Sequence, residues 1–186
     1  MKTNNFDEGF FLQIIEQEAW KRLSGDSHFS WNEQLLERYK DKVDWAGISY
    51  NSAISWSSSM IEKFKSNIDW DNFSNNGNRY LYSVDNLRKF KPYWNWKILS
   101  SNQYIAWNYN VIDEFADLIN WAKFIDLYYD PYFSDPYHDF DRLPVQEFFD
   151  KYKSYFPISS LKKLAPWDIV ISEDEKELTI KILSNT

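Results

Sequence analysis

The sequence predicts an all-α protein, an α-solenoid of about five to six two-helix repeats of 25 residues, and three observations support this fold class. Tryptophan recurs at a nearly constant interval, the residues around each tryptophan recur with it, and the apolar residues between them follow helical periodicity. Aromatic residues are 20% of the 186-residue chain, with ten Trp, thirteen Tyr and fourteen Phe. Repeats that stack on their neighbours would bury this large number of rings.

Two aromatic series mark the repeats. The first is Trp20, Trp45, Trp70, Trp96 and Trp121, and the second is Trp31, Trp56, Tyr82 and Trp107; both advance by 25 or 26 residues. The repeats are expected near residues 5–27, 28–52, 53–77, 78–103 and 104–127. Rings that stack on sugars or bases would stand at irregular positions, so the regular interval favours a structural role.

The first helix of each repeat is expected to begin directly after the second aromatic series. The next residue is Asn32, Ser57, Ser83 or Asn108, and each can accept a hydrogen bond from the first helical turn. The aromatic residue before each cap and the apolar residue four positions after it form a hydrophobic staple. Apolar spacing in the second repeat, at Met60, Ile61, Phe64 and Ile68, is that of a helix.

The second helix of each repeat is expected to begin at the tryptophan of the first series. The preceding residue is Asp44, Asp69, Asn95 or Asn120, again a set of helix caps. Asn51, Asn76 and Asn102 are expected to end this short helix, because asparagine tolerates the left-handed conformation found there. The N-terminal repeat is degenerate, since Ala19 occupies its cap position.

The repeat pattern stops after Phe124. An acidic insertion rich in Tyr and Pro follows over residues 128–144, and a degenerate last repeat is predicted over 145–166, with Tyr152 at a spacing of 37 from Phe115. Insertions in repeat proteins often form the binding face. The insertion is interpreted as a solvated acidic loop, a protein-binding surface or a metal site. Its carboxylates suit a hard cation, but the spacing matches no EF-hand.

The last segment, residues 167–186, is predicted to cap the array. Apolar residues alternate at Ile169 and Ile171 and again at Leu178, Ile180 and Ile182, around a charged stretch. This alternation predicts a small β-hairpin. A helix over "EKELTIKIL" is the alternative.

Composition and charge exclude several classes of protein. Absence of Cys excludes disulfides and thiolate metal sites. No apolar run is long enough for a transmembrane helix, and no signal peptide is recognisable, so a cytoplasmic protein without membrane partners is expected. The net charge of −7 argues against nucleic-acid binding. Residues 113–150, the acidic segment, carry ten acids and two bases, whereas the rest of the chain carries 18 acids and 19 bases.

These observations favour a non-enzymatic protein-protein interaction module. No catalytic motif is present, no cofactor is expected, and neither catalytic nor metal-binding residues are assigned. The partner is expected to be a protein with a basic surface, such as a toxin, nuclease or defence protein, which the chain would inhibit as an immunity-type protein. The expected partner-binding residues are Asp113, Asp117, Asp126, Asp130, Tyr132, Asp135, Tyr137, His138, Asp139 and Asp141.

Two other functions stay open. One is a metal-dependent or carboxylate-based enzyme that uses the 128–144 loop. The other is a structural repeat segment of a larger assembly. The sequence leaves the oligomeric state open as well.

The stretch "KVDWAGISYNSAISWSSSMIEKFKSNIDWDNFSNN", residues 42–76, resembles short tandem repeats of uncharacterised bacterial proteins of Bacteroidetes type and of giant-virus repeat proteins. The resemblance covers roughly residues 28–127. "NSAI" and "NQYI" stand where such repeats often have "NPNI". The resemblance implies a helical-repeat architecture and carries no family function.

Overall fold

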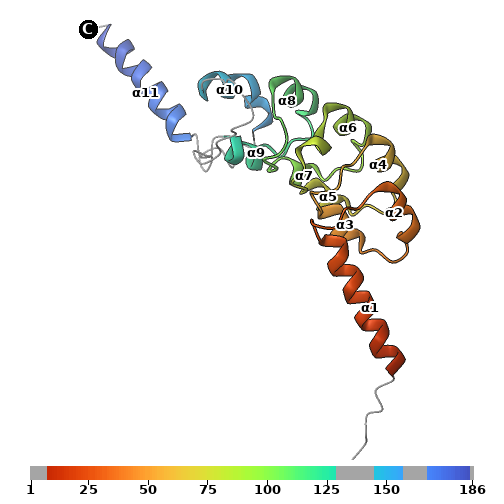
Figure 1. The fold of residues 1–186 in the computed structure, drawn as a ribbon. Coiled ribbons are helices and arrows are strands. Elements are labelled where there is room, and N and C mark those ends of the chain that lie inside the picture. The colour runs from red at the N-terminus through yellow and green to blue at the C-terminus, as the bar shows by residue number, and fades with distance from the viewer. Residues whose placement is uncertain (1–7, 129–144, 157–166, 185–186) are drawn as a thin grey trace, which may run out of the picture. The chain divides into compact units, whose positions relative to one another are not determined.

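The computed structural model describes residues 8–128, 145–156 and 167–184, and within them the chain forms helices and no strand (Figure 1). The prediction of an all-α chain is therefore confirmed for these residues. The chain divides into two compact units, Met1–Asn95 and Trp96–Thr186, here called the N-terminal and C-terminal units.

The N-terminal unit begins with one long helix and continues with pairs of short ones. Its elements are α1 (Glu8–Gly25), α2 (Glu33–Tyr39), α3 (Trp45–Tyr50), α4 (Ser58–Phe64), α5 (Trp70–Ser74), the 3-10 helix η1 (Arg79–Tyr82) and α6 (Val84–Lys89). The first helices of the repeats, α2, α4 and α6, lie side by side in one row (Figure 1). The second helices form another row, in which α3 contacts both α1 and α5.

The C-terminal unit continues the alternation and ends in a second long helix. Its elements are α7 (Trp96–Leu99), α8 (Tyr109–Phe115), α9 (Trp121–Tyr128), α10 (Val145–Tyr152), the 3-10 helix η2 (Lys153–Tyr155) and α11 (Trp167–Leu183). An ion pair between Asp113 and Lys151 joins α8 to α10. Among the described residues of this unit, α8 and α10 are the first helices of their repeats.

Polar caps begin these helices at the predicted residues. The side chain of Asn32 accepts a hydrogen bond from the Leu35 amide, and Ser57 accepts one from Met60. Ser83 and Asn108 cap α6 and α8 in the same way. Asp44, Asp69 and Asn120 cap the second helices. The predicted caps at these seven residues are confirmed, and they fix where each short helix starts.

A tight corner separates the two helices of a repeat, and tryptophan closes it. The carbonyl at the end of α4, on Phe64, accepts hydrogen bonds from the amides of Asn67 and Ile68. This leaves the next carbonyl, on Lys65, without a helical partner, and the indole N–H of Trp70 donates to it at 3.0 Å. Trp45 and Trp121 donate to the carbonyls five residues before them in the same way, at Lys40 and Ala116.

The same tryptophans cover an aromatic ring of the following repeat. The ring pairs are Trp20–Tyr39, Trp45–Phe64, Trp70–Phe90, Trp96–Phe115 and Trp121–Tyr152, with centroids 4.9 to 6.0 Å apart. Each pair except the last lies within 19 or 20 residues, and the last spans the insertion. Tyr152 therefore packs on Trp121 as Phe115 packs on Trp96.

A serine and an asparagine, both buried, connect consecutive repeats through the backbone. The Ser49 hydroxyl accepts the amide hydrogen of Asp69 at 2.9 Å, and the Asn76 side-chain amide donates to the Ser49 carbonyl at 2.8 Å. The serine contact recurs as Ser24–Asp44, Ser74–Asn95 and Ser100–Asn120. All four serines are fully buried. We call this set of contacts the serine ladder.

The predicted left-handed conformation at Asn51, Asn76 and Asn102 is wrong. No described residue has a positive φ, and Asn51 is extended, with φ −67° and ψ 104°. Asn51 and Asn76 instead use both ends of the side-chain amide, and the Asn102 side-chain oxygen accepts from the Tyr104 amide. Asn51 donates to the carbonyls of Ser24 and Asp26, while its oxygen accepts from the Ala53 amide. The asparagine is therefore a connector between repeats.

The predicted β-hairpin over 167–186 is also wrong for the described part, because α11 is a continuous helix from Trp167 to Leu183. The stretch "SEDEKE", residues 172–177, would have to form the turn. It contains no Gly, Pro or Asn, and Glu and Lys favour helix. Thr179 also donates to the Glu175 carbonyl one helical turn earlier.

Replacement of Ser49 by Ala tests the serine ladder. The amide of Asp69 would lose its acceptor within a partly buried contact. We expect the free energy of unfolding, measured by urea denaturation, to fall by about 1–3 kcal/mol. The control is Ser66→Ala at an exposed corner position, with an expected change within about 0.5 kcal/mol. Equal losses in the two variants would contradict a connecting role for Ser49.

Candidate protein-binding surface

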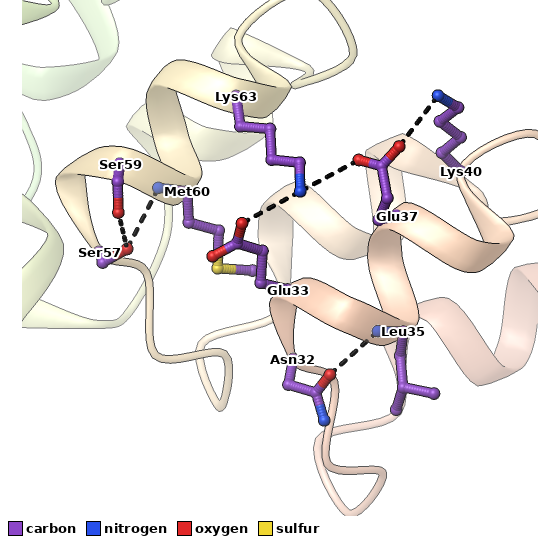
Figure 2. Close-up of polar contacts among 9 residues, drawn as sticks. All are labelled: Asn32, Glu33, Leu35, Glu37, Lys40, Ser57, Ser59, Met60 and Lys63. Atoms are coloured by element: carbon purple, nitrogen blue, oxygen red, sulfur yellow. Dashed lines mark hydrogen bonds and ion pairs between the residues drawn. The ribbon is translucent and has the colours of Figure 1, made fainter.

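A groove between α2 and α4 is lined by charged residues that already neutralise one another. Lys63 on α4 forms ion pairs with Glu33 at 3.1 Å and Glu37 at 3.3 Å on α2 (Figure 2). Hydrogen bonds from Lys40 and then Lys63 lower the pKa of Glu37. The hydrogen bond to Glu33 is the largest cause that raises the pKa of Lys63. The lowered pKa of Glu37 and the raised pKa of Lys63 keep this pair ionised near neutral pH, and the ion pairs of Lys63 join α2 to α4.

A neighbouring hollow lies between the starts of α2 and α4 and contains several hydroxyl groups. Ser57 accepts the Met60 amide and shares a hydrogen bond with Ser59 (Figure 2). Asn32 accepts the Leu35 amide at the start of α2. The polar atoms at both helix starts are therefore engaged in capping.

Three of the predicted partner-binding residues lie in the described part of the C-terminal unit. Asp113 is on α8, Asp117 lies directly after α8, and Asp126 is on α9. The other seven, Asp130, Tyr132, Asp135, Tyr137, His138, Asp139 and Asp141, lie outside the described residues, as does the 128–144 insertion apart from Tyr128.

Asp113 differs from the other two aspartates because it is bound within the protein. Its carboxylate pairs with Lys151 at 2.9 Å and accepts the Tyr152 hydroxyl at 2.8 Å. Burial, followed by the hydrogen bond to Asp113, strongly raises the pKa of Tyr152. Asp113 thus ties α8 to α10 and keeps the Tyr152 hydroxyl protonated as its donor.

Asp117 and Asp126 are exposed and form no ion pair with any described residue. Glu147 on α10 has the same properties. The list of site residues predicted from the sequence omitted Glu147, although it belongs to the acidic segment. The feature that could have identified Glu147 is its place on the polar side of α10, whose buried side carries Phe148 and Tyr152. These three residues, Asp117, Asp126 and Glu147, are called the free carboxylates below.

The described residues show no cluster suited to a metal ion. Nowhere among them do three or more His, Asp or Glu residues come together in a way that could hold one. The metal site considered for the insertion lies outside this part of the chain. The helices of the described ranges also include none with the length and apolar character needed to cross a membrane.

No protein-family model, curated protein sequence or solved structure matches the chain.

Replacement of Tyr152 by Phe tests the contact with Asp113. Because the pKa of Tyr152 is raised above its ordinary value of 10.0 on folding, its contribution to stability is present below that pH and lost as the pH rises. We therefore expect the unfolding free energy of the wild type to fall more steeply than that of Tyr152→Phe as the pH rises above about 10.

The measurement is denaturant unfolding across that pH range. Tyr50→Phe is the matched control, because Tyr50 is 56% exposed. This variant should keep the wild-type pH dependence. Parallel curves for the wild type and Tyr152→Phe would contradict the assignment of a protonated Tyr152.

Proposed function

We propose that the chain is a non-enzymatic, cytoplasmic protein-binding module that uses the acidic segment to hold a protein with a basic surface. An inhibitor or immunity-type protein acting on a basic toxin, nuclease or defence protein fits this description. The single observation that carries the proposal is the concentration of charge: residues 113–150 carry a net charge of −8 and the remaining chain a net charge of +1.

The described carboxylates support this proposal by their state of pairing. In the N-terminal unit, Glu33, Glu37 and Glu62 pair with lysines of their own chain, although Asp41 is exposed and forms no ion pair with any described residue. In the acidic segment, Asp113 and Asp150 pair with Lys151 and Lys153. In the acidic segment the free carboxylates are exposed without such a partner. Unpaired charges of one sign attract a protein of opposite potential and accelerate its association.

The proposed scaffold is an α-solenoid in which the repeats form one continuous array. Each contact of the serine ladder joins residues 20 or 21 positions apart, in both units. The tryptophan interval also continues without a break from Trp70 to Trp96, across the end of the N-terminal unit. Solenoids provide extended surfaces for partner proteins, which suits a binding module.

A structural segment of a larger assembly is the second candidate, and exposed apolar residues at both long helices favour it. Phe10 and Leu12 on α1 are more than half exposed, as are Ile180 and Ile182 on α11. End repeats of an isolated array usually present polar outer faces. An assembly that covers α1 and α11 would explain these positions.

Charge reversal at the free carboxylates tests the binding proposal. The immobilised full chain is used to capture proteins from an extract of the source cells, and the captured protein is purified. We expect it to be basic and to bind more weakly as salt concentration rises. Asp117→Lys/Asp126→Lys/Glu147→Lys should lower its affinity at least tenfold in isothermal titration calorimetry at low salt, because three attractive contacts become repulsive.

The matched control is Asp41→Lys/Asp174→Lys/Glu177→Lys, which reverses three exposed carboxylates outside the acidic segment. Both triple variants have the same net charge, so the comparison separates a local surface from overall charge. The control should bind within about twofold of the wild type. Equal losses in both variants, or a captured partner that is insensitive to salt, would refute the role of the acidic segment.

A further inference from the structure

The first half of α1 exposes a set of apolar side chains that no described element covers well. The exposed fractions are 58% for Phe10, 51% for Phe11, 59% for Leu12, 45% for Ile14 and 49% for Ile15. The second half of the same helix is anchored, because Ser24 is fully buried in the serine ladder and α1 contacts α3. The exposed surface therefore belongs to a helix that is firmly held at its other end.

Three of these residues, Phe10, Phe11 and Ile14, occupy apolar positions of a first helix of a repeat, whereas Leu12 and Ile15 stand at the positions of Glu37 and Lys40. Phe11 precedes Leu36 by 25 residues, and Leu36 and its equivalents Ile61, Leu87 and Ile112 are all fully buried. Likewise Phe10 corresponds to Leu35 and Ile14 to Tyr39. The first half of α1 thus carries apolar residues of a repeat helix and leaves each of them about half exposed.

Two substitutions explain why α1 is straight. The buried apolar residue at the other corners, such as Val43, is replaced by Glu18, which is exposed and pairs with Arg22 at 3.2 Å. The capping residue is replaced by Ala19, which cannot start a second helix. Since the chain forms no corner, Trp20 donates to the Glu16 carboxylate at 3.3 Å instead of to a freed carbonyl.

The surface that would receive such a helix is open on α2. Within the N-terminal unit, α4 turns Met60 and Phe64 toward the preceding repeat, and both are buried. The equivalent residues of α2 are Leu35 and Tyr39, and both stay only half-buried. In the row α2, α4, α6 (Figure 1), the packing face of α2 is therefore covered only in part, by Trp20 on Tyr39.

We propose that the first half of α1 of one copy packs on this face of α2 of a second copy, and that the exchange is reciprocal. The contact continues the established row of α2, α4 and α6 by one helix, with the same apolar positions. Packing on α2 of its own chain requires a corner near Glu18, which Glu18 and Ala19 oppose. A reciprocal contact between two copies needs no corner and gives a closed two-fold dimer.

The register of the contact follows from the ion pairs between neighbouring first helices. The pairs Glu37–Lys63 and Glu62–Lys89 each join the fifth residue after one cap to the sixth residue after the next cap. Leu12 of α1 precedes Glu37 by 25 residues and therefore occupies the fifth position. Arg38 of α2 occupies the sixth position after the cap Asn32. Arg38 forms no ion pair with any described residue, so it is accessible for the contact.

Cross-linking between two singly substituted chains tests the contact directly. The chain contains no cysteine, so introduced cysteines are unique. Chains carrying Leu12→Cys and Arg38→Cys are mixed and treated with a short bismaleimide. We expect a covalent product of twice the chain mass that contains one copy of each variant. Leu12→Cys mixed with Lys176→Cys, on α11, is the control and should give at least tenfold less product.

Sedimentation of the full-length chain gives the second measurement. The wild type should be a dimer, and Leu12→Lys/Ile15→Lys should raise the dissociation constant at least tenfold without change in helical circular dichroism. The matched control Leu178→Lys/Ile182→Lys alters two equally exposed apolar residues on α11 and should stay dimeric.

Three results would overturn the proposal. One is a monomeric wild type at micromolar to millimolar concentration. Another is a dimer that only the α11 substitutions dissociate. The third is a doubly substituted Leu12→Cys/Arg38→Cys chain that cross-links within a single copy, which would show that α1 folds back on its own α2. None of these results bears on the acidic segment, so failure here leaves the proposed function standing.

Discussion

The described structure depends on a buried serine hydroxyl that accepts a backbone hydrogen bond from the next repeat. Helices of four to eight residues are too short to be stable alone, because nucleation costs more than so few hydrogen bonds return. The Ser49 hydroxyl satisfies the Asp69 amide, and the Ser49 carbonyl accepts from Asn76. One residue thus satisfies polar groups of the next repeat at two places, so each repeat fixes the start and end of the following short helix.

Tryptophan joins this polar ladder to the apolar core. A corner necessarily leaves a carbonyl unpaired, and a buried carbonyl without a donor is costly. The indole of Trp70 pairs this carbonyl and also fills the core, since its N–H donates to the Lys65 carbonyl while its ring packs on Phe90. Phenylalanine could supply only the ring. Trp45 and Trp121 have the same double role. In the second aromatic series tyrosine replaces tryptophan at Tyr82, whose hydroxyl donates to the Phe73 and Asn76 carbonyls.

Local signals in the sequence predicted the helix starts well and the long-range roles poorly. Caps such as Asn32 and Ser57 act within one turn, so their spacing from the following apolar residues is sufficient evidence. Asn51 bonds to residues 25 and 27 positions earlier, and nothing in its local sequence distinguishes that role from a helix end. The hairpin error at α11 arose because five alternating apolar residues were weighed above the helix preference of the charged residues between them. For the candidate site, composition located the acidic segment, but only coordinates separate Asp113, which is paired, from Asp117, which is not.

In the proposed array of repeats, the residues at the two ends decide what else the chain can bind. At α1 the change from an apolar residue and a cap to Glu18 and Ala19 removes one corner and has two consequences at once. It moves the apolar side of a repeat helix away from its own chain, and it leaves Leu35 and Tyr39 of α2 incompletely covered. A polar α1 would expose no apolar surface, yet Phe10, Leu12 and Ile15 make the exposed surface of α1 apolar. The two surfaces are complementary because both descend from one repeat interface, and this common origin makes a second copy of the chain the partner that fits both.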